Sequence, residues 1–173
     1  MGAMRMLRSF EFLTLMLLLV VAGAYWWHYA PHLPERIPTH FNGRGVADGW
    51  TGREGFVWFY WGIIGGVVTV FLLLSALILK APASLINLPR HDFWLAPERE
   101  EETRLELVRR LLTLADATVI FYLVLTHLSV RSALDESGAM GPEFNWILGI
   151  YLAYVAVWTG LLLRHFSRTP SPR

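Results

Sequence analysis

The stretch VWFYWGIIGGVVTVFLLLSALIL, residues 57–79, carries no charged side chain over 23 residues. An α-helix needs about 17 to 25 predominantly apolar residues to cross the roughly 30 Å hydrocarbon core of a bilayer. Three further blocks are similar in length and composition: residues 12–27, 111–130 and 146–163. With 54% hydrophobic and 17% charged residues, the 173-residue chain is too apolar for an ordinary soluble domain. We therefore predict an all-α integral membrane protein with four transmembrane helices.

The predicted organisation is a single four-span membrane domain over residues 1–166. Its spans, with their flanking residues, are placed at about 10–29, 57–79, 111–130 and 145–164. A Pro/Gly-rich loop at 31–56 joins the first two spans, and a longer loop at 81–110 joins the second and third. Residues 167–173 are mostly Ser, Pro and Arg, a composition typical of a disordered tail.

The distribution of Lys and Arg predicts the orientation. With the N-terminus inside, eleven of these residues fall on the cytoplasmic side and four on the outer side, in loops 31–56 and 132–143 and at their edges. The positive-inside rule therefore places both termini and loop 81–110 in the cytoplasm and loop 31–56 outside. The net charge of +1, spread among the loops, gives no basis for nucleic-acid binding. The absence of cysteine excludes disulfides, thiolate catalysis and cysteine metal sites.

Loop 31–56 is too rich in helix breakers to continue either neighbouring helix. Pro31, Pro34 and Pro38 favour extended backbone in its first half. Asn42-Gly43 and Asp48-Gly49 supply positions that suit tight turns. We expect a loop of fixed shape, and a loop of this length between spans is usually functional or disordered.

The motif in this loop resembles the signature of a bacterial membrane family called domain of unknown function 1648. The matching residues are Leu33, Pro34, Ile37, Pro38, His40, Phe41, Asn42, Gly45, Asp48, Gly49 and Trp50. A second stretch, residues 87–102, resembles a motif that recurs in close relatives of that family, and its motif residues are Asn87, Pro89, Trp94, Pro97, Glu98 and Arg99. The domain also forms the N-terminal part of SdpI-type immunity proteins, in which further membrane segments follow. The resemblance implies a bacterial inner-membrane protein, immunity against a membrane-active toxin and signalling to a soluble regulator.

Two kinds of chemistry are open to the polar residues of the outer loop. His28, His32 and His40 with Asp48 could form a histidine-and-carboxylate metal site, but their spacing matches no established zinc motif. The favoured interpretation is that His40, Asn42 and Asp48 hydrogen-bond to the loop's own backbone and hold its shape. We therefore predict no metal and no cofactor, with His32, His40 and Asp48 as the candidate ligands if a metal binds.

The cytoplasmic stretch places charges beside an aromatic side chain at the predicted bilayer surface. Arg90, Trp94 and Arg99 would anchor the loop at the headgroups, and the alternative is a docking surface for a soluble protein partner. Pro97 is placed as a first helical residue. Because neither Gly nor Pro interrupts residues 98–130, we predict one helix from Pro97 to Val130, about 50 Å long.

Asp116 is the only acidic residue well inside a predicted span. On a helical wheel it shares one face with Arg109, Thr113 and His127. The favoured role is an interhelical hydrogen bond, and the alternative is proton or ion transport.

Small residues form faces on two of the predicted spans. They are Gly62, Gly65, Gly66 and Thr69 on the second span, and Gly149, Ala153, Ala156 and Gly160 on the fourth. We interpret both faces as packing surfaces within the chain, with dimerisation as the alternative.

Together these features predict a non-enzymatic module that senses an extracytoplasmic peptide or small ligand through His40, Phe41 and Asn42. Residues 87–102 would then be presented to a soluble cytoplasmic partner. The lipid bilayer is also a predicted partner, because it surrounds the four spans. The alternatives are a metal-dependent membrane enzyme using His40 and Asp48, or a small transporter using Asp116.

Overall fold

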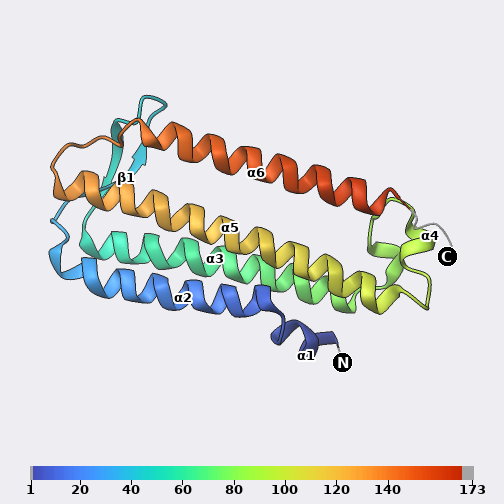
Figure 1. Ribbon diagram of the computed structural model, residues 1–173. Coiled ribbons are helices and arrows are strands. Elements are labelled where there is room, and N and C mark those ends of the chain that lie inside the picture. Colours follow the sequence, from blue (N-terminus) through green and yellow to red (C-terminus); the bar gives the residue numbers. More distant parts are fainter. Residues whose placement is uncertain (1, 169–173) are drawn as a thin grey trace.

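The computed structural model describes residues 2–168, with only the backbone described at Gly2 and Ala3. Most of the predicted disordered tail, residues 169–173, lies outside the described residues. Four long helices run side by side (Figure 1): α2 (Phe10–Tyr29), α3 (Arg53–Lys80), α5 (Glu100–Leu134) and α6 (Glu143–Phe166). The shorter elements are α1 (Gly2–Leu7), β1 (Ile37–Phe41), β2 (Ala47–Thr51), α4 (His91–Trp94) and 3-10 turns at Ala30–His32 and Ala83–Leu85.

Each of the four long helices is apolar and long enough to cross a membrane, so the predicted all-α, four-span architecture is confirmed. The two ends of the bundle differ in structure (Figure 1). One carries the β-hairpin and the α5–α6 loop, and is called the hairpin end. The other carries α4 and the C-terminus of α6, and is called the Trp94 end.

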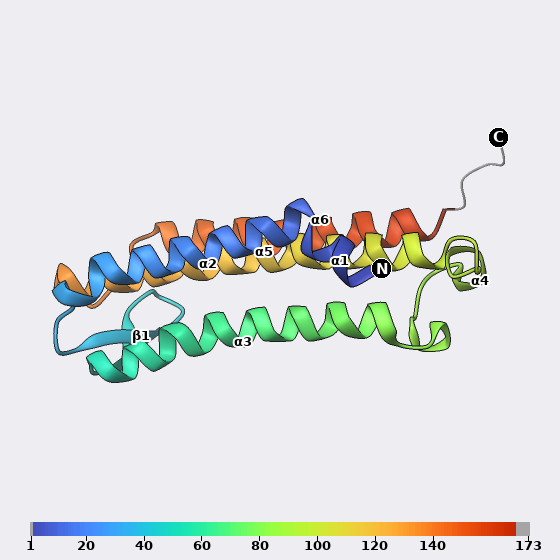
Figure 2. The same ribbon diagram turned by 90° about the horizontal axis from the view of Figure 1, so that it is seen from below.

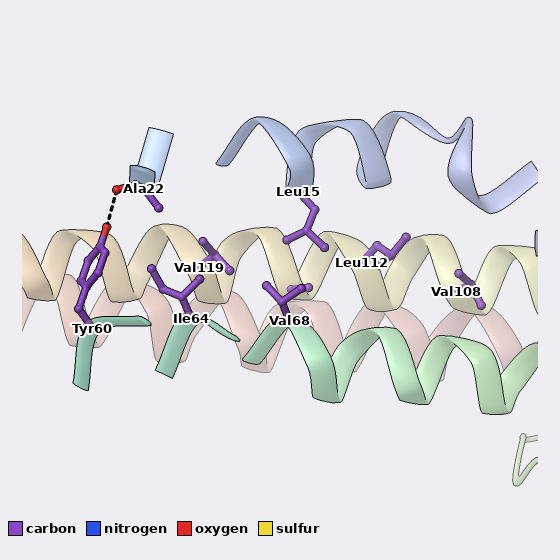
Figure 3. Close-up of a cluster of buried hydrophobic side chains, with 9 residues drawn as sticks. Leu15, Ala22, Tyr60, Ile64, Val68, Val108, Leu112 and Val119 are labelled. Atoms are coloured by element: carbon purple, nitrogen blue, oxygen red, sulfur yellow. Dashed lines mark hydrogen bonds between the residues drawn. The ribbon is translucent and has the colours of Figure 1, made fainter. Parts of the chain in front are cut away.

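Helices α2, α3 and α5 form the packed centre of the bundle. Their buried side chains make one cluster: Leu15, Ala22, Tyr60, Ile64, Val68, Val108, Leu112, Ala115 and Val119. Figure 3 shows these residues pointing toward one another from three helices, and the Tyr60 hydroxyl donating a 2.9 Å bond to the Ala22 carbonyl. Since lipid is as apolar as these side chains, helix association here depends on close packing and such hydrogen bonds.

Helix α6 lies along α5 and away from α3 in both views (Figures 1 and 2). Aromatic side chains of α6 bond it to α5: Trp158 Nε1 donates to the Arg110 carbonyl at 3.2 Å, and the Tyr151 hydroxyl lies 2.9 Å from Thr118 Oγ1. The Tyr151 ring also stacks on Phe121 with 4.1 Å between centroids.

The predicted use of the small-residue faces for packing within the chain is wrong. A Cβ atom added at Gly62, Gly65, Gly66, Gly149 or Gly160 would meet no heavy atom of the chain within 4 Å. Ala153 and Ala156 are exposed as well. The faces therefore point away from the bundle. The α2–α3–α5 contact uses larger side chains such as Leu15 and Ile64.

Helix α5 is a single unbroken helix, as predicted, but it begins at Glu100 and extends four residues beyond Val130. Pro97 is therefore not the first helical residue. The Ala96 carbonyl accepts bonds from the Arg99 and Glu100 amides in a turn before the helix. This turn places the Trp94 carbonyl 2.7 Å from Thr103 Oγ1, a tertiary bond that the residue pattern does not show.

The predicted loop 31–56 contains a two-stranded antiparallel hairpin, β1–β2. Asn42 Oδ1 accepts bonds from the Arg44 and Val46 amides at 2.9 and 3.2 Å, so the prediction that Asn42 bonds the loop's own backbone is confirmed. The two strands were not predicted from the sequence, because Pro38 and Gly49 are residues that disfavour strand interiors. Gly49 is required here, since a Cβ atom would lie 2.8 Å from the Cβ of His40 on β1.

Candidate functional site

The hairpin rests on the end of α5. Ser129 Oγ donates a buried 2.5 Å bond to the carbonyl of Pro38 on β1. Around this bond, apolar residues from the hairpin, the segment that precedes it, α3 and α5 form a small core: Leu33, Ile37, Phe56, Val130 and Ala133. The hairpin is therefore fixed to the helix that runs through the whole bundle.

The α5–α6 loop holds the tip of the hairpin from the other side. The Met140 amide donates to the Gly45 carbonyl and the Ala47 amide to the Gly138 carbonyl, each at 2.8 Å. Gly45 has a φ of +75°, and a Cβ atom there would lie 3.0 Å from the Met140 carbonyl oxygen. The Arg36 guanidinium lies 5.1 Å from the Trp50 ring centroid.

His40 and Asp48 pair across the two strands, with His40 Nδ1 2.5 Å from Asp48 Oδ1. Their side chains are 74% and 46% exposed. The expectation that both bond the loop's own backbone is therefore wrong. In the hairpin His40 is opposite Gly49, and Asp48 lies at the register shift between Gly49 and Ala47. This local irregularity brings the two side chains together, and their spacing of eight residues in the sequence gave no sign of the pairing. The pair leaves His40 Nε2 without a hydrogen bond to the described residues.

The candidate metal ligands are not gathered in one place. His32 Nδ1 lies 3.0 Å from the carbonyl of His28, in the turn after α2. Within residues 2–168, no three His, Asp or Glu side chains are placed to hold a metal ion together. The trio His32, His40 and Asp48 is thus reduced to the His40–Asp48 pair.

A cavity of about 170 Å³ lies beneath the hairpin, between β1, α3, α5 and the start of α6. Its walls combine apolar side chains with a polar rim, and are formed by Thr39, His40, Phe41, Phe56, Phe59, Tyr122, Leu125, Thr126, Ser129, Met140 and Phe144. Apolar walls with a few convergent polar groups are the usual form of a small-molecule site. Two motif residues, His40 and Phe41, belong to this cavity.

The Trp94 end is organised by a buried aromatic side chain. Trp94 Nε1 donates a 2.8 Å bond to the Phe166 carbonyl at the C-terminus of α6, and its ring meets Phe166 edge-on. Trp94 is only 9% exposed, so its ring packs mainly against the chain itself. The role seen in the structure is to join α4 to α6.

Arg104 performs a similar role between α5 and α3, and sequence reasoning missed it. Its guanidinium pairs with Glu100 at 2.6 Å and donates to the carbonyls of Ala81, at 2.8 Å, and Ile78. The last carbonyls of a helix have no partner within the helix, so these bonds cap α3. The four-residue spacing of Glu100 and Arg104 is typical of a local pair on one helix, but only the meeting of two helix ends shows the cap.

The other motif residues of this end remain near the surface. Asn87, Pro97, Glu98 and Arg99 are exposed, and Pro89 is half-buried in the turn before α4. Hydrogen bonds from His91 to the carbonyl of Ala83 and to Asp92 raise the pKa of His91 above its usual value.

The polar face predicted on α5, which includes Asp116 and His127, makes only some contacts with a neighbouring helix. His127 Nδ1 lies 3.4 Å from the Tyr25 hydroxyl of α2, so this face of α5 turns toward α2. Asp116 is buried, and its Oδ1 has no hydrogen-bond partner among the described residues. The interhelical hydrogen bond expected of Asp116 is therefore absent from the described part of the chain.

The helices and the two ends define a multi-pass helical membrane protein. Residues 15–64, which cover most of α2, the hairpin and the start of α3, match the family described as Domain of unknown function (DUF1648). This segment therefore carries that domain, as its motif predicted, and the match ends well before the Trp94 stretch. Comparison with curated proteins and with solved structures gave no match.

Proposed function

We propose that this chain is a non-enzymatic membrane module, of the SdpI-like immunity or signalling kind, that binds a ligand at the hairpin end. Binding is passed to the Trp94 end through α5. The observation that carries the proposal is the bonding of α5 at both ends. Ser129 bonds the hairpin at the carbonyl of Pro38, and Thr103 bonds the Trp94 carbonyl. No Gly or Pro interrupts the 35 residues of this helix.

In the proposed orientation the hairpin end faces outside, and both termini lie in the cytoplasm of a bacterium. The split of eleven Lys and Arg residues against four supports this direction. Under this arrangement, exposed Asn87, Glu98 and Arg99 are available to a soluble partner on the inner side.

The proposed ligand is a peptide or small molecule that inserts an apolar group beneath the hairpin. A cavity of about 170 Å³ suits one aromatic or branched aliphatic group, since an engineered apolar cavity of about 150 Å³ holds benzene. The exposed His40–Asp48 pair at the rim would hydrogen-bond a polar part of the ligand.

Hydrogen exchange measured by mass spectrometry, with the protein in lipid nanodiscs, tests the coupling. Ser129→Ala removes the bond between α5 and the hairpin. We expect faster exchange in residues 37–51 and also in residues 81–99 at the opposite end. The matched control is Ser75→Ala, because Ser75 Oγ bonds only the carbonyl of Phe71 within its own helix. The control should change neither segment, and a change in residues 37–51 alone would contradict the coupling.

A metal-dependent enzyme at His40 and Asp48 is the second candidate, favoured only by the pairing of these two side chains. It lacks a third ligand nearby in residues 2–168. Metal analysis of the purified protein separates the two functions. One equivalent of zinc that disappears in His40→Gln would favour the enzyme.

A further inference from the structure

Asp116 is the one acidic residue in the apolar part of α5, residues 111–130. It is 8% exposed, and its Oδ1 is fully buried with no donor among the described residues. Buried polar groups in proteins are hydrogen-bonded in about nine cases out of ten, so this oxygen is exceptional. Asp116 takes no part in the proposed ligand binding at the hairpin. It also takes no part in the contacts of Trp94 and Arg104 that join the helix ends.

Within residues 2–168, Oδ1 of Asp116 has no hydrogen-bond partner, and no ion pair involves Asp116. It lies on the α2-facing side of α5, the side on which His127 meets Tyr25. Its neighbours in sequence and on this side, Leu112 and Ala115, are part of the buried cluster. Arg109 is seven residues away, about 10 Å along the helix axis, and forms no ion pair in the described residues. The side chain of Asp is too short to extend to the headgroups as Lys and Arg do.

An ionised carboxylate without a partner is energetically unfavourable at this position. An ionised Asp at the centre of a membrane helix costs about 2.5 to 3.5 kcal/mol even on the lowest scale. A divalent cation would offset that cost, but it takes about six to eight oxygen ligands in the case of calcium. No group of three or more candidate ligands occurs within residues 2–168. A proton needs only the carboxyl group itself.

A cavity of about 800 Å³ opens between the start of α2 and α5, and its lining includes Arg8, Glu11 and Arg109 but not Asp116. The Asp116 carboxyl is thus buried away from this cavity, without a donor at Oδ1 among the described residues. We propose that Asp116 is a membrane-embedded proton-binding site.

This site is independent of the hairpin and extends the proposed function. Protonated Asp116 lets α2 and α5 pack as apolar surfaces, and loss of the proton places a charge between them. The site therefore gives the membrane domain a group that responds to pH.

Labelling with dicyclohexylcarbodiimide, an apolar carbodiimide, tests the protonation of Asp116 in nanodiscs at neutral pH. The carboxyl proton passes to a carbodiimide nitrogen, the carboxylate oxygen adds to the central carbon, and acyl migration to nitrogen gives a stable adduct that retains every atom. We expect one adduct on the peptide that contains Asp116. It should persist in Asp116→Glu and be absent in Asp116→Asn. A water-soluble carbodiimide should modify Glu11 and leave Asp116 unmodified.

An unlabelled Asp116 in the folded wild-type protein would overturn the proposal, as would equal labelling by both reagents, which would show a hydrated carboxylate. The pH dependence tests the same protonation. Labelling should fall about tenfold for each pH unit above the midpoint of deprotonation.

Discussion

The hairpin end and the Trp94 end are both irregular stretches with unusual residue patterns, but their polar groups are used differently. At the hairpin end His40 and Asp48 pair with each other and stay exposed above a small apolar cavity. At the Trp94 end Trp94 and Arg104 are buried and bond the ends of α6 and α3. An unusual stretch between membrane helices can therefore be an exposed polar surface or an internal contact between helix ends, and burial distinguishes the two.

The largest expected effect is on the internal joint formed by Arg104. Arg104→Ala leaves Glu100 and the carbonyls of Ile78 and Ala81 without their donor. Removing one partner of a buried ion pair costs about 3 to 5 kcal/mol, so we expect a loss near 3 kcal/mol in the free energy of unfolding. Denaturant titration in mixed micelles measures it.

The matched control is Arg110→Ala. Arg110 forms the same four-residue pair on the same helix, with Glu106, but does not cap α3. Partly exposed pairs are worth about 1 kcal/mol or less. Equal losses in the two variants would show that the cap on α3 adds nothing.

A smaller effect is expected for Trp94→Phe. The ring is retained in part, but the bond from Nε1 to the Phe166 carbonyl is lost and a buried acceptor is left unpaired. The expected cost is about 1 to 3 kcal/mol, seen as a lower melting temperature and faster exchange in residues 160–166. Trp58→Phe is the control, because Trp58 is 80% exposed. If both variants melt at the wild-type temperature, Trp94 is not a joint.

At the hairpin end the backbone of the turn should matter more than its exposed side chains. Gly45→Ala forces a side chain into a φ of +75° and toward the Met140 carbonyl. Left-handed backbone costs about 1 to 2 kcal/mol for residues other than glycine, so protection of residues 37–51 from exchange should fall by that amount. Gly43→Ala, where a Cβ atom meets open space, should leave protection unchanged. Equal loss of protection in both variants would show that the left-handed backbone at Gly45 is not the cause.

The smallest effect is expected for the exposed pair. His40→Gln and Asp48→Asn keep some hydrogen-bonding capacity, and pairs this exposed contribute about 1 kcal/mol or less. Melting temperature and expression should be close to those of the wild type. A cost comparable to that of Arg104→Ala would mean that the pair is structural, and the contrast between the two ends would disappear.

The sequence was sufficient for the four helices because bilayer thickness sets the length of an apolar span, as residues 57–79 illustrate. The turn at Asn42 was also predictable, since its side chain bonds amides two and four residues away. The family resemblance of the loop agrees with the match over residues 15–64.

The remaining features depend on contacts between distant residues. The His40–Asp48 pair follows from the register shift in the hairpin, and the contacts of Trp94 and Arg104 follow from helix ends meeting. The Gly62 and Gly66 face was misread because the same spacing serves contacts within a chain, with lipid or with another chain. The pattern of neighbouring residues in the sequence does not show which of these contacts form.

Binding of an extracytoplasmic ligand at the hairpin requires that the hairpin end of the bundle faces outside. The chain has no cysteine, so single-cysteine variants give a clean measurement with a membrane-impermeant maleimide on intact cells. Gly43→Cys at the hairpin tip and Leu85→Cys at the Trp94 end are both at exposed positions. We predict that Gly43→Cys reacts in intact cells and that Leu85→Cys reacts only after permeabilisation. The reverse pattern would contradict ligand binding at the hairpin from outside.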